Sequence, residues 1–163
     1  MKINFQIPIL SLSLVLAMVF AGAGFSASPL KPEEEQALKE AIADEYKARA
    51  FYQATIDRFG EIRPFSNIIN AETRHAEMVA NLFVQYGLPV PEDTYAGKVA
   101  APESLLAACE AGVQSEIENK ELYDRLLVNV SQPDIRLTLE RLRDASQNNH
   151  LPAFERCQRR YSR

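Results

Sequence analysis

Signals for β-strands are almost absent from this sequence of 163 residues. It shows no sustained alternation of apolar and polar residues, and the dipeptides Asn-Gly and Asp-Gly, which favour tight hairpins, do not occur. A nucleophile elbow, a phosphate-binding glycine loop and a His-Glu-x-x-His zinc-protease motif are also missing. These absences argue against a β-rich fold, and they make a hydrolase or a nucleotide-dependent enzyme a poor interpretation.

Residues 1–27 have the pattern of a secretory signal peptide. Lys2 gives a short basic start, residues 7–20 form an apolar run, and small residues follow, so we expect cleavage between 23 and 28. An uncleaved membrane anchor is the alternative. No cysteine lies near the cleavage region to support lipid attachment. The sequence therefore predicts a periplasmic or secreted protein that leaves the membrane after cleavage, with one domain over 28–163.

Basic residues are too few and too scattered for a nucleic-acid-binding surface. Loss of the leader removes only Lys2, which leaves 17 basic against 22 acidic side chains and a net charge of −5. A mildly acidic chain without a basic stripe predicts no nucleic-acid partner. Four arginines within 156–163 close the last expected helix. Cations suit the C-terminal end of a helix dipole, so we interpret these arginines as a solvated end.

Four segments repeat apolar residues at helical spacing, and a proline stands at the start of each, where its missing N–H costs least. The expected helices cover residues 32–59, 64–86, 102–129 and 133–158. The link over 88–101 contains two prolines and a glycine, shows no helical period, and can span about 45 Å when extended. We therefore expect an all-α four-helix bundle in which a long crossover joins two antiparallel hairpins, the ferritin-like arrangement.

Three glutamates and both histidines of the chain interrupt the apolar stripes of these helices. Glu72 and His75 are three residues apart, so a helix places them on one inward face. Glu45, Glu116 and His150 hold inner positions on the other three helices. Carboxylates and imidazoles that face one another across a bundle form the sites of di-iron and di-manganese proteins. The pattern predicts these five residues as metal ligands.

The motifs around these residues resemble those of a known family. They are DEYKA at 44–48, RPFSNII at 63–69, ETRH at 72–75 and QNNHLPAF at 147–154. They are similar to the rubrerythrin-related branch of the ferritin-like superfamily, and in particular to small secreted bacterial members. The resemblance covers nearly all of the chain after the leader. It implies two iron ions held by the five residues, with O₂ or peroxide as the reactant.

One position departs from the family pattern. The second Glu-x-x-His of the family has Gln147 in place of its glutamate, before His150. We expect no nearby acid to replace it, because Asp144 should face away and Glu140 lies about 15 Å along the helix from His150. Three carboxylates leave two divalent ions with a net charge of +1, so the second ion should bind more weakly. A single ion, or zinc or manganese, therefore stays open as an alternative to two iron ions.

Three interpretations of function remain. The first is an exported di-iron protein that oxidises iron or reacts with O₂ or peroxide. Because the chain has no rubredoxin-like Cys-x-x-Cys, its electrons would come from a donor protein or from iron itself. The second is a metal-binding or metal-buffering module without catalysis. The third is a metal-free interaction domain, since Arg49 and Lys120 each follow an inner glutamate by four residues, as in ordinary helix-stabilising pairs. A homodimer is compatible with all three.

The two cysteines of the chain stand on the third and fourth expected helices. Cys109 lies seven residues before Glu116, and Cys157 lies seven residues after His150. On antiparallel helices the two cysteines share one level, so we expect a disulfide in an exported protein, with two buried free thiols as the alternative.

Pro152 predicts a kink in the last expected helix. Three tyrosines near the expected site receive no role from the sequence: Tyr46, Tyr52 and Tyr123.

Overall fold

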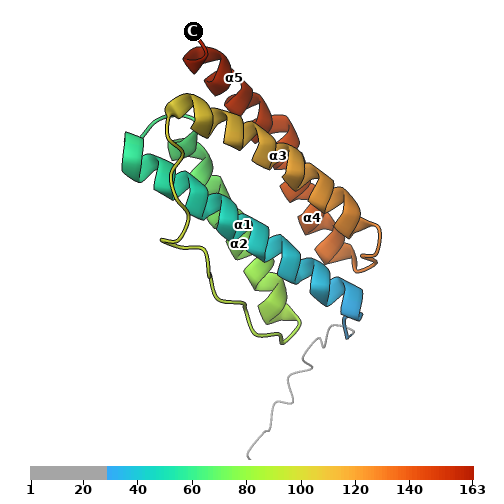
Figure 1. The fold of residues 1–163 in the computed structure, drawn as a ribbon. Coiled ribbons are helices and arrows are strands. Elements are labelled where there is room, and N and C mark those ends of the chain that lie inside the picture. Colours follow the sequence, from blue (N-terminus) through green and yellow to red (C-terminus); the bar gives the residue numbers. More distant parts are fainter. Residues whose placement is uncertain (1–28) are drawn as a thin grey trace, which may run out of the picture.

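The computed structural model describes residues 29–163, so the predicted leader and its cleavage lie outside the described residues. The described part is helical, without a β-strand (Figure 1). Its elements are α1 (Pro32–Phe59), α2 (Phe65–Gln85), α3 (Leu105–Leu127), α4 (Pro133–Ala145), the π-helical turn η1 (Ser146–His150) and α5 (Leu151–Tyr161). None of the described helices combines the length and the apolar character that crossing a bilayer requires. The all-α prediction is confirmed.

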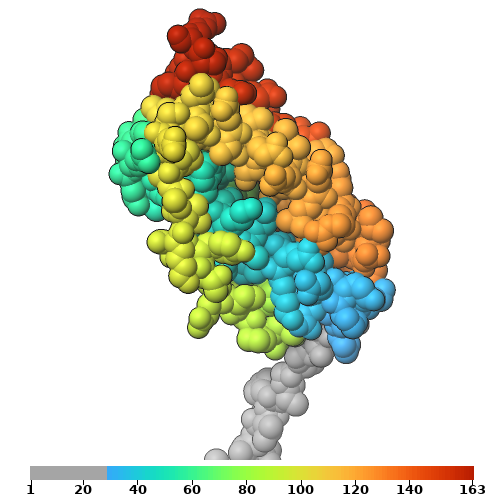
Figure 2. Space-filling view, viewed as in Figure 1, coloured from blue at the N-terminus to red at the C-terminus, as the bar shows by residue number. Residues whose placement is uncertain are grey.

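Two antiparallel hairpins make up the bundle. The first joins α1 to α2 through Gly60, whose φ of 86° lies in the left-handed region that glycine tolerates. The second pairs α3 with the continuous run of α4, η1 and α5 (Figure 1). The crossover after α2 lies along the outside of the first hairpin (Figure 2). The predicted connectivity is therefore confirmed.

The crossover is fastened to α1 by polar contacts. Tyr46 donates its hydroxyl hydrogen to the carbonyl of Pro91 at 3.3 Å. Arg49 forms an ion pair with Asp93 at 2.7 Å, and the Asp93 carboxylate also accepts from the backbone N–H of Tyr95 at 2.9 Å. These contacts fix the position of the crossover on the surface of the bundle, although the crossover has no regular secondary structure.

The boundaries of α3 differ from the prediction. This helix begins at Leu105, because Ser104 adopts an extended conformation and its hydroxyl accepts a hydrogen bond from the N–H of Ala107 at 3.1 Å. A serine N-cap sets the start of a helix more directly than a proline two residues earlier. The expectation that Pro102 opens the third helix was wrong, and the helix also ends at Leu127, two residues early.

The last predicted helix is a single run of turns with a change of pitch in the middle. Where a simple kink was expected at Pro152, residues 146–150 form a π-helical turn. The N–H of Leu151 bonds to the carbonyl of Ser146 in the wider pattern of such a turn. Pro152 follows this turn directly as the second residue of α5, so the backbone hydrogen bond that a proline cannot donate is missing at the change of pitch.

Two apolar clusters fill the bundle, one on each side of the polar inner positions. One cluster includes Leu38, Ile42, Val79, Phe83, Leu139 and Leu142. The other includes Tyr52, Phe65, Ile68, Phe154 and the two cysteines. Cys109 and Cys157 form a disulfide that ties α3 to α5, which confirms the predicted pairing. On each inner stripe, the predicted metal ligands lie between residues of the two clusters.

Glu34 fastens the start of α1 to the loop between α3 and α4. This fully buried carboxylate accepts hydrogen bonds from the backbone N–H groups of Lys31, Ser131 and Gln132, at 3.1, 2.9 and 3.0 Å. It also accepts one from the hydroxyl of Ser131 at 2.8 Å. Burial alone raises the pKa of a carboxyl group, but these donors outweigh burial and lower the pKa of Glu34 to about 2.

We expect Glu34→Gln to lower the free energy of unfolding by about 1–3 kcal/mol at neutral pH, because the charged acceptor is lost. The pKa of Glu34 is depressed on folding, so its contribution is complete above the ordinary pKa of 4.5 and disappears as the pH falls towards about 2. Wild type and variant should therefore converge in urea denaturation between these pH values. Glu33→Gln, at an exposed neighbouring position, serves as the control. Equal stability of Glu34→Gln and wild type at pH 7 would contradict the assignment.

Candidate metal centre

The five predicted ligands come together inside the bundle. They form two groups whose ligand atoms lie within 4.8 Å of one another, Glu45 with Glu72 and His75, and Glu72 with Glu116 and His150. Glu72 belongs to both groups. All five side chains are buried or nearly buried. The helical spacing therefore placed every one of them at the same level of the bundle.

The two carboxylate oxygens of Glu72 face different histidines. Nδ1 of His75 lies 3.0 Å from one oxygen of Glu72 and 3.5 Å from Glu45. Nδ1 of His150 lies 3.0 Å from the other oxygen of Glu72 and 3.5 Å from Glu116. The two imidazole rings stack with centroids 5.6 Å apart. Glu72 thus occupies a bridging position, with one imidazole and one further carboxylate on each side of it.

Two buried tyrosines orient the outer carboxylates. Tyr52 on α1 donates to Oε1 of Glu116 on α3 at 2.6 Å, and Tyr123 on α3 donates to Oε1 of Glu45 on α1 at 2.5 Å. Each glutamate precedes the tyrosine of its own helix by seven residues, so the two helices make the same contact in reciprocal directions. The bond fixes one oxygen of each carboxylate and leaves the other facing the centre. The repeated Glu-x₆-Tyr spacing was the signal that sequence reasoning left unused.

Two buried atoms at the centre have no hydrogen-bond partner in the described part of the chain. They are Oε2 of Glu45 and Nδ1 of His150. Although Nδ1 of His150 lies close to carboxylate oxygens, its orientation forms no hydrogen bond with them. Buried polar atoms are rarely left without a partner. The two atoms belong to different ligand groups, and a metal ion bound in each group would account for both. The donor set therefore fits a metal centre with nitrogen and oxygen ligands.

The electrostatics of the centre reflect closely packed acids and imidazoles. Burial lowers the pKa of an imidazole, but the neighbouring carboxylates outweigh it and raise the pKa of His75 to about 9 and that of His150 to about 10. Burial works against ionisation of Glu72, but the two neighbouring histidines hold its pKa well below the usual range. Burial and the charge of Glu72 raise the pKa of Glu45 well above its ordinary value. Protons and metal ions therefore compete for the same atoms.

The basic residues that could have paired with the inner glutamates have other partners. Arg49 pairs with Asp93, and Lys120 pairs with Asp124 at 2.6 Å. Neither the helix-stabilising pair with Glu45 nor the one with Glu116 forms. The explanation of these glutamates as members of ordinary surface pairs was therefore wrong.

Gln147 does not stand at the inner position that the sequence assigned to it. Its side chain is exposed, and Ser146 is buried instead. In a regular α-helix the residue three positions before His150 shares its face, but the wider π-helical turn rotates that residue away. The expectation that Gln147 replaces an inward carboxylate was wrong. This turn presents a serine hydroxyl beside the centre.

A chain of hydrogen bonds links this serine to an acid that sequence reasoning missed. Ser146 donates its hydroxyl hydrogen to the side-chain oxygen of Asn119, and the Asn119 amide donates to Asp44, both at 2.6 Å. Burial, with smaller contributions from the charges of Glu72 and Glu116, outweighs the Asn119 hydrogen bond and raises the pKa of Asp44 to about 6. Asp44 therefore lies beside the centre, on α1, whereas a substitute carboxylate was sought only near Gln147.

Comparison with known families identifies the family of this chain. A model of the rubrerythrin family matches residues 36–156, a range that contains all five predicted ligands. The chain belongs to the rubrerythrin family. The predicted resemblance is thereby confirmed at the level of the family, and membership of a secreted branch stays a prediction. Rubrerythrin-family membership and the two carboxylate–histidine groups together indicate a protein that binds iron or another metal.

Solved structures share the fold of this rubrerythrin-family chain. A hypothetical protein from Methanococcus jannaschii DSM 2661 is 24% identical with a TM-score of 0.74, over 83% of this chain and 85% of that one. Mycobacterium tuberculosis bacterioferritin is 16% identical with a TM-score of 0.69, over 82% and 89%. A ferritin-like, diiron-carboxylate protein from Bacillus anthracis str. Ames is 20% identical with a TM-score of 0.65, over 79% and 99%. Comparison with curated proteins found no match.

Proposed function

We propose that this protein is an exported di-iron carboxylate protein that acts in iron oxidation or in peroxide or O₂ chemistry. The observation that carries the proposal is the pair of groups that share Glu72, with two buried ligand atoms left without a hydrogen-bond partner. The rubrerythrin-family match supports it. One of the structural neighbours is described as a diiron-carboxylate protein.

The two groups of residues would hold two ions. Glu45 and His75 would hold one ion, Glu116 and His150 would hold the other, and Glu72 would serve both groups. Bound iron supplies the one-electron redox chemistry with which O₂ or peroxide is reduced. Tyr52 and Tyr123 keep the outer carboxylates in place, and burial of the ligands keeps bulk water away. No organic substrate is required, because electrons come from ferrous iron as substrate or from a donor protein.

Export is supported by the cysteines. The chain joins its two cysteines in a disulfide, and such bonds persist in oxidising compartments such as the periplasm or the exterior of the cell. The predicted signal peptide also supports export. The proposed localisation is therefore periplasmic or secreted, and both an electron-donor protein and a homodimer are compatible with it.

A metal-binding or metal-buffering module is the second candidate. It is favoured by the absence of an acid on η1, since three ligand carboxylates leave two divalent ions with a net charge of +1. A single ion, zinc or manganese included, would leave no excess positive charge on such a set of ligands. The metal-free interaction domain has lost its main support, because Arg49 and Lys120 pair elsewhere.

The test is the metal content of protein that has been exported and purified without chelators, measured by elemental analysis. Near two irons per chain, with near-ultraviolet absorption and consumption of peroxide or oxidation of ferrous iron, is the expected result. About one zinc or manganese ion per chain without turnover would favour the metal-binding module instead. Protein that remains metal-free after incubation with ferrous iron, zinc and manganese would overturn both.

A further inference from the structure

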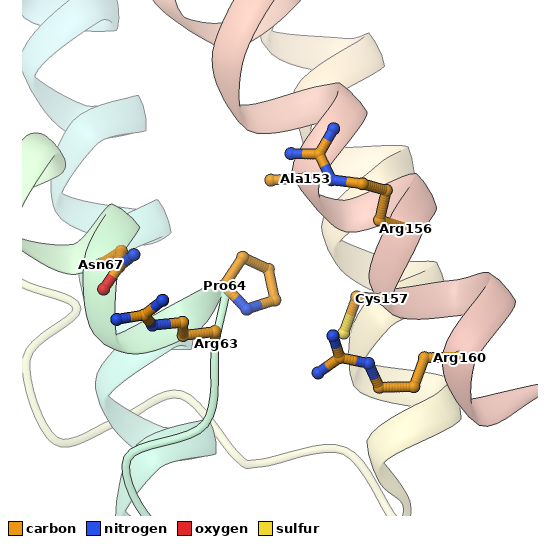
Figure 3. Close-up of a pocket in the computed structure, with 7 residues that line it drawn as sticks. All are labelled: Arg63, Pro64, Asn67, Ala153, Arg156, Cys157 and Arg160. Carbon is orange, nitrogen blue, oxygen red and sulfur yellow. The ribbon is translucent and has the colours of Figure 1, made fainter.

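A second polar site lies at the end of the bundle where α2 begins and α5 ends. A hollow of about 320 Å³ opens there between the two helices (Figure 3). Its lining consists of Arg63, Pro64, Asn67, Ala153, Arg156, Cys157 and Arg160. We call this hollow the arginine pocket. Arg156 and Arg160 line it from α5, one turn apart, and Arg63 lines it from the residue before Pro64, with its side chain directed towards Asn67 (Figure 3).

The three arginines of this pocket lack acidic partners. Among residues 29–163, none of them forms an ion pair. Five other arginines pair with carboxylates, and four more, Arg58, Arg74, Arg141 and Arg163, also form no ion pair among these residues, so the distinguishing feature is that three such side chains line one hollow. The chain carries a net charge of −4, so acids are in excess elsewhere on it. Three uncompensated guanidinium groups around one hollow therefore make a local positive field.

The helix dipole explains the arginines of α5 but not Arg63. Arg156 and Arg160 lie near the C-terminal end of α5, where cations are favourable. Arg63 comes directly before Pro64, the N-cap of α2, where a cation faces the positive end of the dipole. The first turn of α2 contains no acidic residue, and Pro64 makes no capping hydrogen bond with a side chain. The three side chains are exposed to solvent, which screens their mutual repulsion, and an anion bound among them would offset what remains.

We infer that the arginine pocket binds a small phosphate-class oxyanion with at least two negative charges. Planar guanidinium groups bind such anions through paired, charge-assisted hydrogen bonds. The N-terminus of α2 favours an anion at the same place, and the amide of Asn67 supplies a further polar group in the lining. The volume is ample for phosphate or for the phosphate of a lipid headgroup. These are two sources of the same chemistry.

The arginine pocket is separate from the metal centre. Arg160 follows His150 by ten residues, about 15 Å along the helix, and Arg156 follows it by six, about 9 Å. None of the five metal ligands lines the pocket, so an anion bound by these arginines does not contact them. Its binding should be the same in the metal-free and the metal-loaded protein, and this separates the inference from the proposed function.

The experiment titrates full-length protein with inorganic phosphate by calorimetry, against chloride at equal ionic strength, with and without metal. Arg63→Gln/Arg160→Gln removes one guanidinium from each side of the pocket. Lys98→Gln/Arg141→Gln makes the same change of net charge at two exposed positions outside it. We expect saturable phosphate binding whose Kd rises about tenfold or more in the pocket variant and stays unchanged in the control. Vesicles of phosphatidylcholine, with and without phosphatidylglycerol, test the lipid source.

Each outcome decides the inference. Phosphate binding that depends on the pocket arginines supports a free anion as the ligand. Binding only to phosphatidylglycerol vesicles, lost in the pocket variant alone, supports a lipid headgroup. Equal weakening in both double variants would show a general charge effect and overturn the pocket. Phosphate binding that requires metal would place the anion at the metal centre and overturn it as well, and so would the absence of binding in every arm.

Discussion

Glu72→Gln should remove both metal ions, whereas Glu45→Gln and Glu116→Gln should each leave about one ion per chain. Glu72 is the only residue that belongs to both ligand groups, and each of its oxygens lies 3.0 Å from a different imidazole. An amide keeps the shape of the side chain but offers a single neutral oxygen. One substitution therefore weakens two sites at once, while each outer glutamate serves one site. Elemental analysis after dialysis measures the difference.

Glu77→Gln is the matched control for this series, because Glu77 is exposed on the same helix. It should keep the metal content of wild type. Circular dichroism of all variants in the metal-free state separates loss of ligands from loss of fold. A folded Glu72→Gln protein that still holds two ions would contradict the bridging position of Glu72. Loss of both ions in Glu45→Gln alone would show that the two groups do not bind metal independently.

Replacement of both cysteines, Cys109→Ser/Cys157→Ser, should give the largest loss of stability. The disulfide joins residues 48 positions apart, and a closed loop of that length is worth about 4 kcal/mol in the chain-entropy model. For a chain of this size, such a loss lowers the melting temperature by about 10 °C. The two cysteines are 0% and 4% exposed, so the polar serine hydroxyls add a further cost. Thermal unfolding of metal-free protein measures the effect.

Reduction of wild type separates the disulfide from the packing of the side chains. Wild type treated with a strong reductant keeps both sulfur atoms in the core and should lose most of the same stability. The same reductant should leave the melting temperature of the double variant unchanged. If oxidised and reduced wild type unfold at one temperature, the cross-link does not stabilise the fold.

Much of the fold could be predicted from the sequence because helical periodicity fixes the face on which each residue lies. Glu45, Glu72, His75, Glu116 and His150 interrupt apolar stripes, and a buried acid or imidazole needs a hydrogen bond, an opposite charge or a metal ion. Periodicity does not fix how one helix is rotated and shifted against the next. Only the packed bundle therefore showed that the two oxygens of Glu72 face two histidines.

The same limit explains the unpredicted contacts of the tyrosines. Seven-residue spacing placed Tyr52 and Tyr123 on the inner stripes, but the sequence could not show that each reaches the glutamate of the opposite helix. That contact depends on the distance between α1 and α3. Apolar side chains on all the helices set this distance together.

Local irregularity was the other source of error. The spacing of apolar residues assumes 3.6 residues per turn, and it placed Gln147 beside His150. The π-helical turn before Pro152 rotates Gln147 to the surface and Ser146 inward. By itself, the sequence determined the helices, their connections and the five inward polar residues, because these depend on periodicity. The tertiary structure alone decided which polar groups meet, since that depends on helix rotation, the π-helical turn and distances between helices.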